Sequence, residues 1–271
     1  MPTEATEQID ELPEDVAAAW ATVLLDLWEK RQTQERRDAE QSTEAAHATA
    51  PVRVTPEEHG RREVAIQAGG VQLRGWLTVP PGARAMVLFT HGSGSGRSSP
   101  RSAYVAGVLQ SAHMATLLTD LLSWEESRDP RRLFDDALLA QRLLQVVRWV
   151  KGEPDVRDLR LGLHAANTGV AATLIAAADE PEVGALVLRG GRPDQAGPAL
   201  PFVAAPTLLL VGADDARGLQ HCHAALRELR CPHELVVVAG AGYLFEEHGV
   251  LREAARRTRE WFERQLAPPE Y

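Results

Sequence analysis

Short apolar runs alternate with helical patterns along most of this chain. The runs are continuous rather than alternating, which is typical of strands that are covered on both faces. They lie at 85–90, 115–119, 159–163, 185–188, 207–211 and 235–238. Helical patterns lie between most of them, at about 100–112, 133–152, 168–179, 217–229 and 249–266. This alternation predicts an α/β fold with a doubly wound, mostly parallel sheet and helices on both faces.

An antiparallel hairpin is expected before the first buried run. Two short alternating stretches, 64–66 and 71–77, flank the pair Gly69-Gly70. A glycine pair between two such stretches is typical of a tight hairpin turn. Residues 61–271 are therefore expected to form one domain that begins with this hairpin.

Residues 1–60 form an acidic arm of different character. They hold 14 acidic and 5 basic side chains, a net charge of −9 that equals the charge of the whole chain. An amphipathic helix is predicted at about 14–40, followed by a polar linker, and its apolar stripe includes Trp20, Leu24, Leu27 and Trp28. Two hypotheses stay open: the stripe packs on its own subunit, or it docks a protein partner or a second copy in a homodimer.

Composition and charge limit the binding partners and the cellular compartment that we expect for this chain. The body at 61–271 is electrically balanced, and phosphate binding needs a basic patch, so no nucleic-acid partner is expected. Neither a signal peptide nor an apolar run of about 20 residues is apparent, which predicts a cytoplasmic protein without a membrane partner. Cys222 and Cys231 resemble reduced thiols, and with the nearby histidines they match no zinc spacing. We expect no metal and no cofactor.

The stretch from Leu161 to Ala172 predicts a strand, a sharp turn and a helix. Small residues surround the bend, as in the nucleophile elbow of hydrolases, where backbone packs closely on backbone. The central residue is Asn167. A carboxamide has no proton that a base can remove near neutral pH, so acyl transfer cannot start from it. The residue at such an elbow has an unusual positive φ, which Asn accepts more readily than most residues, so a purely conformational reason for Asn167 stays open.

Four loops together resemble one family. They are His91-Gly92-Ser93-Gly94-Ser95-Gly96, the bend at 165–169, Val211-Gly212-Ala213-Asp214-Asp215, and Gly240-Ala241-Gly242-Tyr243-Leu244-Phe245-Glu246-Glu247. Their order, with the stretches 118–122 and 189–194, resembles the dienelactone hydrolase-like branch of the α/β-hydrolases over about 61–268. The resemblance implies the α/β-hydrolase fold.

The resemblance also assigns roles by position. It puts the nucleophile on Asn167, the acid on Asp215 and the base on Tyr243, with the backbone N–H groups of Ser93 and Thr168 as oxyanion donors. A phenol, with an ordinary pKa of about 10, cannot replace an imidazole as the base for an alcohol at neutral pH. The triad positions are therefore predicted to be degenerate.

Three functional hypotheses follow. In the first, the chain is a pseudo-hydrolase that binds a small molecule or a protein, and the Tyr243 ring fills the imidazole space with its hydroxyl bonded to Asp215. In the second, the chain is a lyase, isomerase or cyclase that uses Tyr243 for proton transfer. In the third, it is an ester or lactone hydrolase with displaced residues, for which Ser93, Ser95 and His248 are candidates.

Overall fold

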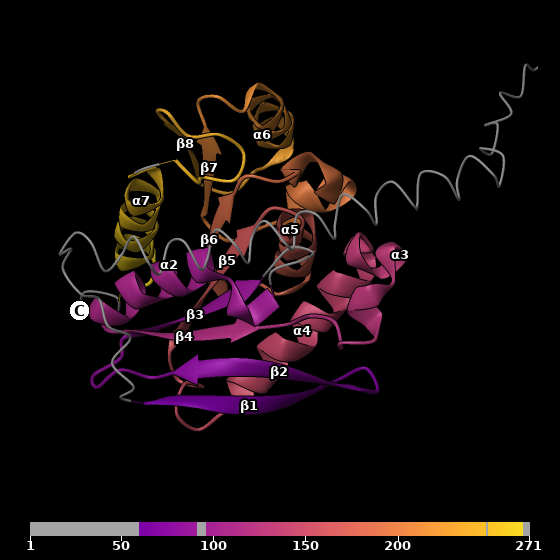
Figure 1. The fold of residues 1–271 in the computed structure, drawn as a ribbon, viewed down its shortest axis with the longest axis vertical. Helices are drawn as coiled ribbons and strands as arrows, with labels where there is room; N and C mark the ends of the chain where they lie inside the picture. Colours follow the sequence, from indigo (N-terminus) through magenta and orange to yellow (C-terminus); the bar gives the residue numbers. More distant parts are fainter. Residues whose placement is uncertain (1–59, 91–95, 248, 268–271) are drawn as a thin grey trace, which may run out of the picture. The chain divides into compact units, whose positions relative to one another are not determined.

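A single twisted sheet organises the described part of the chain (Figure 1). The computed structural model describes residues 60–90, 96–247 and 249–267. Within them the strand order is β1-β2-β4-β3-β5-β6-β7-β8, and β1 to β2 and β2 to β4 are the antiparallel pairs. The strands are β1 (Arg61–Ala68), β2 (Val71–Thr78), β3 (Ala85–Thr90), β4 (Met114–Thr119), β5 (Arg160–Ala166), β6 (Val183–Arg189), β7 (Thr207–Gly212) and β8 (His233–Val238).

Helices cover both faces of the sheet. The longer ones are α2 (Pro100–Ser111), α4 (Asp136–Gly152), α5 (Gly169–Asp179), α6 (Ala216–Glu228) and α7 (Val250–Gln265). Buried side chains of α2 and α7 share one apolar cluster with the sheet, whereas those of α4, α5 and α6 share the other. The predicted doubly wound sheet with helices on two faces is confirmed.

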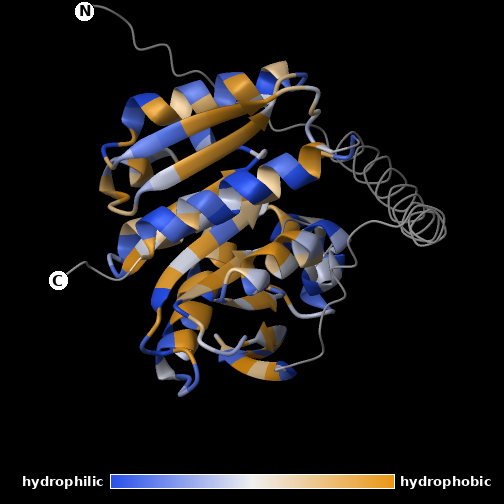
Figure 2. Ribbon diagram, turned by 90° about the vertical axis from the view of Figure 1, so that its left-hand side faces the viewer, coloured by the Kyte–Doolittle hydropathy of each residue, from blue (hydrophilic) through white to orange (hydrophobic). Residues whose placement is uncertain are grey.

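The burial of the central strands explains why the sequence pattern was informative. Every residue of β3, β4 and β7 is buried, in keeping with continuous apolar runs. In the ribbon coloured by hydropathy the strands inside the molecule are largely hydrophobic, whereas the helices around them alternate hydrophilic and hydrophobic residues (Figure 2). The hairpin is also confirmed, because β1 pairs with β2 from Arg61↔Thr78 to Ala68↔Val71 around Gly69-Gly70.

Four short helical segments had no counterpart in the sequence prediction. They are η1 (Gly96–Ser98), η2 (Glu126–Arg128), α3 (Pro130–Leu133) and η3 (Pro193–Phe202). Prolines and a left-handed Gly197 (φ 47°) interrupt the longest of them. Segments this short, or broken in this way, carry too few turns to show a helical period.

The predicted arm lies outside the described residues. These belong to a unit that spans Val54–Tyr271, so the helix at about 14–40 and its side chains Trp20, Leu24, Leu27 and Trp28 remain predictions. In the part of the chain that is described, no helix combines the length and apolarity that crossing a bilayer requires.

Candidate functional site

The bend after β5 has the conformation that the sequence predicts for an elbow. Asn167 has a φ of 54°, in the left-handed region, and α5 begins two residues later. Its backbone N–H donates to the Arg189 carbonyl (3.1 Å), and its own carbonyl accepts from Val170 N (3.2 Å). Left-handed backbone is uncommon outside glycine, and Asn is one of the residues that accept it at low cost. The expected positive φ is therefore confirmed.

Two glycines after β6 let the neighbouring backbone approach this bend. A Cβ added at Gly191 (φ 77°) would lie 2.2 Å from the Asn167 carbonyl oxygen. A Cβ added at Gly190 (φ 62°) would lie 3.4 Å from Asn167 Oδ1 and 4.0 Å from Tyr243 Cε2. The Asn167 amide and the Tyr243 ring are thus brought together across Gly190.

The loop after β7 carries Asp215, and it is attached to the loop after β8. Asp214 N donates to the Ala241 carbonyl (3.0 Å), and Gly212 lies so close that an added Cβ would be 2.1 Å from the same oxygen. Asp215 caps α6, because its Oδ1 accepts from Gly218 N (2.9 Å). Its Oδ2 is buried and accepts no hydrogen bond from any described residue.

The expected sealed cluster is wrong. The pseudo-hydrolase hypothesis places the Tyr243 hydroxyl on Asp215, with all three side chains satisfied. Instead Tyr243 is 40% exposed, and both Asp215 Oδ2 and Asn167 Oδ1 are buried without a hydrogen-bond partner among the described residues. With two of its polar oxygens unsatisfied, the cluster is not the closed one that this hypothesis requires.

A buried guanidinium lies beneath the Tyr243 loop. Arg189, at the end of β6, is 2% exposed; its Nη1 donates to the Leu244 carbonyl (3.4 Å), and its guanidinium stands 5.2 Å from the Phe245 ring centre. No described carboxylate pairs with it. Burial, with a smaller contribution from the nearby charge of Arg101, lowers its pKa to about 10, and the charge of Tyr243 acts in the opposite direction.

A small cavity opens beside these residues. Its volume is about 90 Å³. Asn167 and Tyr243 line it. The remaining lining residues come from the same bend and the first turn of α5, and from two other segments: Thr168, Ala171, Phe134, Asp136, Gly191, Arg192 and Gln195. Phe134 is the C-cap of α3 and Asp136 begins α4. Neither was identified from the sequence, because nothing local marks a residue that faces a pocket built by distant loops.

A comparison with solved structures decides the family. The chain is 46% identical to a dienelactone hydrolase from Anabaena variabilis; the match covers 77% of this chain and 100% of the other, with a TM-score of 0.74. This chain belongs to the dienelactone hydrolase-like family of the α/β-hydrolases. The family resemblance predicted from the four loops is thereby confirmed, although no family model matches the sequence.

Other relatives of this α/β-hydrolase are more distant or much longer. Est1E from Butyrivibrio proteoclasticus is 16% identical, with a TM-score of 0.65 over 76% of this chain and 99% of the other, and so shares the fold. Two proteins of Mycobacterium tuberculosis, from strains CDC 1551 and H37Rv, are each 47% identical over 208 residues and are each named a putative phosphoribosyl transferase. The match covers 76% of this chain but 47% of those proteins, so the chain spans about half the length of these curated relatives.

The remaining candidate residues of this hydrolase-family chain are only partly placed. Ser93, Ser95 and His248 lie outside the described residues, so the displaced triad and one of the two oxyanion donors remain predictions. Thr168 is described, as the N-cap of α5. Cys222 and Cys231 are free thiols buried in the core, and burial raises the pKa of Cys222 to about 12. Over the described ranges, no group of three or more His, Cys, Asp or Glu side chains could hold a metal ion.

Proposed function

We propose that this chain is a catalytically degenerate member of its family, a pseudo-hydrolase that binds a small molecule in the cavity beside Asn167. One observation carries the proposal: the left-handed residue at the bend between β5 and α5 is an asparagine. The elbow of an α/β-hydrolase presents its nucleophile at that bend. A carboxamide there binds or positions a ligand but does not attack a carbonyl carbon.

The surroundings of Asp215 support the same proposal. In a working triad the acid accepts a hydrogen bond from the histidine that it orients. Here Asp215 Oδ2 is buried without a partner in the described residues, and the aromatic side chain of the facing loop is Tyr243. A carboxylate left without its imidazole is expected when a relay has lost its base.

The size of the rate enhancement distinguishes residual catalysis from that of an intact triad. In a triad whose members act as a unit, loss of the nucleophile costs about 10⁶ in rate, and further losses add little. An oxyanion hole and binding alone leave an advantage of about 10³ to 10⁴ over water. We therefore expect ester turnover no higher than this background.

A second candidate function, non-hydrolytic chemistry by Tyr243, is favoured by Arg189. The charge of Tyr243 raises the pKa of that guanidinium, so the buried cation and the phenol interact electrostatically. A lyase, isomerase or cyclase would use Tyr243 beside this cation for proton transfer. The transferase name belongs to whole proteins, of whose length this chain matches less than half.

The N-terminal arm and the compartment complete the proposal. We infer that the stripe of Trp20, Leu24, Leu27 and Trp28 docks a second copy or a protein partner, and that the chain works in the cytoplasm. Light scattering on the full chain and on a variant lacking residues 1–59 tests the homodimer. The homodimer is supported if the full chain has the mass of two subunits and the deletion variant has the mass of one. It is refuted if both proteins have the same number of subunits.

The test of the pseudo-hydrolase is activity-based labelling with a fluorophosphonate, together with p-nitrophenyl ester turnover. The unaltered protein should not be labelled, and its slow turnover should be unchanged by Asn167→Gly, which removes the carboxamide and accepts the positive φ. Labelling, or robust turnover that is abolished by Ser93→Ala, Ser95→Ala or His248→Ala, would establish a displaced triad and refute the proposal. A phenolate mechanism would instead appear as turnover that Tyr243→Phe removes without any labelling.

A further inference from the structure

The cavity beside Asn167 combines one carboxylate with two aromatic rings. Asp136 lines it and is half-buried, and no described residue gives its carboxylate a hydrogen bond or an ion pair. Phe134 and Tyr243 line it too, and these residues are 62% and 40% exposed. A ligand in the cavity would therefore meet the Asp136 carboxylate and the solvent-accessible parts of both aromatic residues.

The other charges at the cavity are already neutralised. Arg192 lines it, but its Nε and Nη2 donate to the two carboxylate oxygens of Asp194 at 2.9 and 2.7 Å. A guanidinium held in this bidentate way offers little to an anion. Burial raises the pKa of Asp136, and repulsion from Asp135 raises it further. Among the described residues that line the cavity, Arg192 is the one cation, and its pairing with Asp194 leaves the Asp136 carboxylate without a positive charge beside it.

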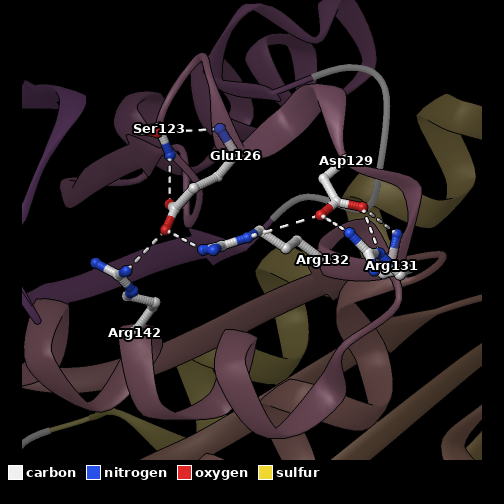
Figure 3. A network of polar contacts seen from close by, with 6 residues as sticks. All are labelled: Ser123, Glu126, Asp129, Arg131, Arg132 and Arg142. Carbon is white, nitrogen blue, oxygen red and sulfur yellow. Dashed lines mark hydrogen bonds and ion pairs between the residues drawn. The ribbon is translucent and has the colours of Figure 1, made fainter.

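The segment that supplies Phe134 and Asp136 is firmly attached. Glu126, 10% exposed, accepts from Arg132 Nη1 (2.7 Å), Arg142 Nη2 (3.0 Å) and Ser123 N (3.0 Å), as Figure 3 shows. Arg142 also donates to the Ala68 carbonyl of β1.

The start of α4 is fixed as well. Asp135 caps the helix through Leu138 N (2.9 Å), which places Asp136 in the first turn. The binding groups are thus preorganised, which lowers the cost of ordering them around a ligand.

We propose that this cavity binds a small organic cation, with an ammonium group against Asp136 and its apolar substituent against the rings of Phe134 and Tyr243. The inference rests on the proposed binding function and names the ligand class. Aromatic faces attract cations through their quadrupole, and an adjacent carboxylate adds a direct ion pair. A volume of about 90 Å³ holds the head group, while the rest of the ligand extends past the exposed rings.

The test uses the full chain and two probes that differ only in charge. Binding of 4-fluorobenzylamine and 4-fluorobenzyl alcohol is measured by ¹⁹F NMR titration at pH 7. The amine should bind at least about tenfold more tightly than the alcohol, and added salt should weaken the amine alone. Equal affinities for the two probes would overturn the proposal without any variant.

Variants then locate the charge. Asp136→Asn should weaken the amine about tenfold and leave the alcohol unchanged, whereas Phe134→Ala should weaken both. Asp158→Asn is the matched control, since Asp158 is exposed and precedes β5 at the opposite end of that strand from Asn167. Unchanged amine affinity in folded Asp136→Asn refutes the inference. Fluorophosphonate labelling bears only on the proposed loss of hydrolysis, so the two failures are distinguishable.

Discussion

Restoring a serine nucleophile and a histidine base tests how much of the hydrolase machinery this chain retains. The change is Asn167→Ser together with Tyr243→His. The two side chains approach one point from both sides, at 3.4 and 4.0 Å from the position of an added Gly190 Cβ. Asp215 Oδ2 is buried and free to accept from a new imidazole among the described groups, because Oδ1 alone caps α6.

The expected gain follows from the cooperativity of a triad. Serine at 167 without a base, or histidine at 243 without a nucleophile, should leave turnover within about threefold of the unaltered protein, since either loss alone removes most of the rate. The double variant should gain at least about 10². The full factor of about 10⁶ is not expected. A histidine side chain at 243 is shorter than the tyrosine that it replaces, and the position of its imidazole relative to the serine is not optimised.

The assay is p-nitrophenyl acetate hydrolysis with burst kinetics, and fluorophosphonate labelling detects the acylated serine position. Asp215→Asn in the double-variant background is the control, because asparagine can still cap α6 but cannot stabilise an imidazolium. It should remove most of the gain while the protein stays folded.

Two results would refute the reasoning. A folded double variant that is neither labelled nor active would mean that residues 167 and 243 do not present their new side chains to each other. Equal activity of one single variant and the double variant would mean that another residue already supplies the missing part, and the assignment of Tyr243 to the base position would be wrong.

Three further predictions concern stability. Glu126→Gln should lower the free energy of unfolding by about 3 kcal/mol, because Arg142 is buried with it. Arg132→Gln should lower it by less than about 1 kcal/mol, because Arg132 is 47% exposed. Urea unfolding of both variants measures the two losses, and equal losses would contradict the role of burial. Gly191→Ala should cost about 1–3 kcal/mol more than Gly197→Ala, since both glycines have positive φ but nothing lies within 4 Å of a Cβ at Gly197. Hydrogen bonds from Arg256 and Arg257 lower the pKa of Glu253 to about 2, below its ordinary 4.5, so their stabilisation is present above pH 4.5 and lost as the pH falls toward 2. The gap between the unaltered protein and Glu253→Gln, under about 1 kcal/mol for this exposed cluster, should therefore close at pH 2 in a pH series of melting temperatures.

The sheet, the hairpin and the bend could be predicted from short stretches of neighbouring residues. Continuous apolar runs such as 85–90 and 207–211 predicted strands that are buried on both faces, and they are. The left-handed φ of Asn167 was predicted because the small residues around it and the strand-to-helix change are local features of a few consecutive residues. The periodicity of apolar residues and the steric limits on backbone conformation depend on neighbouring positions, so they can be recognised in a single sequence.

The surroundings of that bend depend on segments that are distant in the sequence and meet only in the folded chain. Asp136 and Phe134 reach the cavity from a segment more than 30 positions away, held by Glu126 and Arg142, and nothing in their own neighbourhood marks them as pocket residues. The exposure of the Tyr243 ring, the missing partner of Asp215 Oδ2 and the buried charge of Arg189 depend likewise on how the loops after β6, β7 and β8 pack together. The burial of a side chain and the pairing of its polar atoms depend on residues that are distant in the sequence, and these residues come together only when the chain folds.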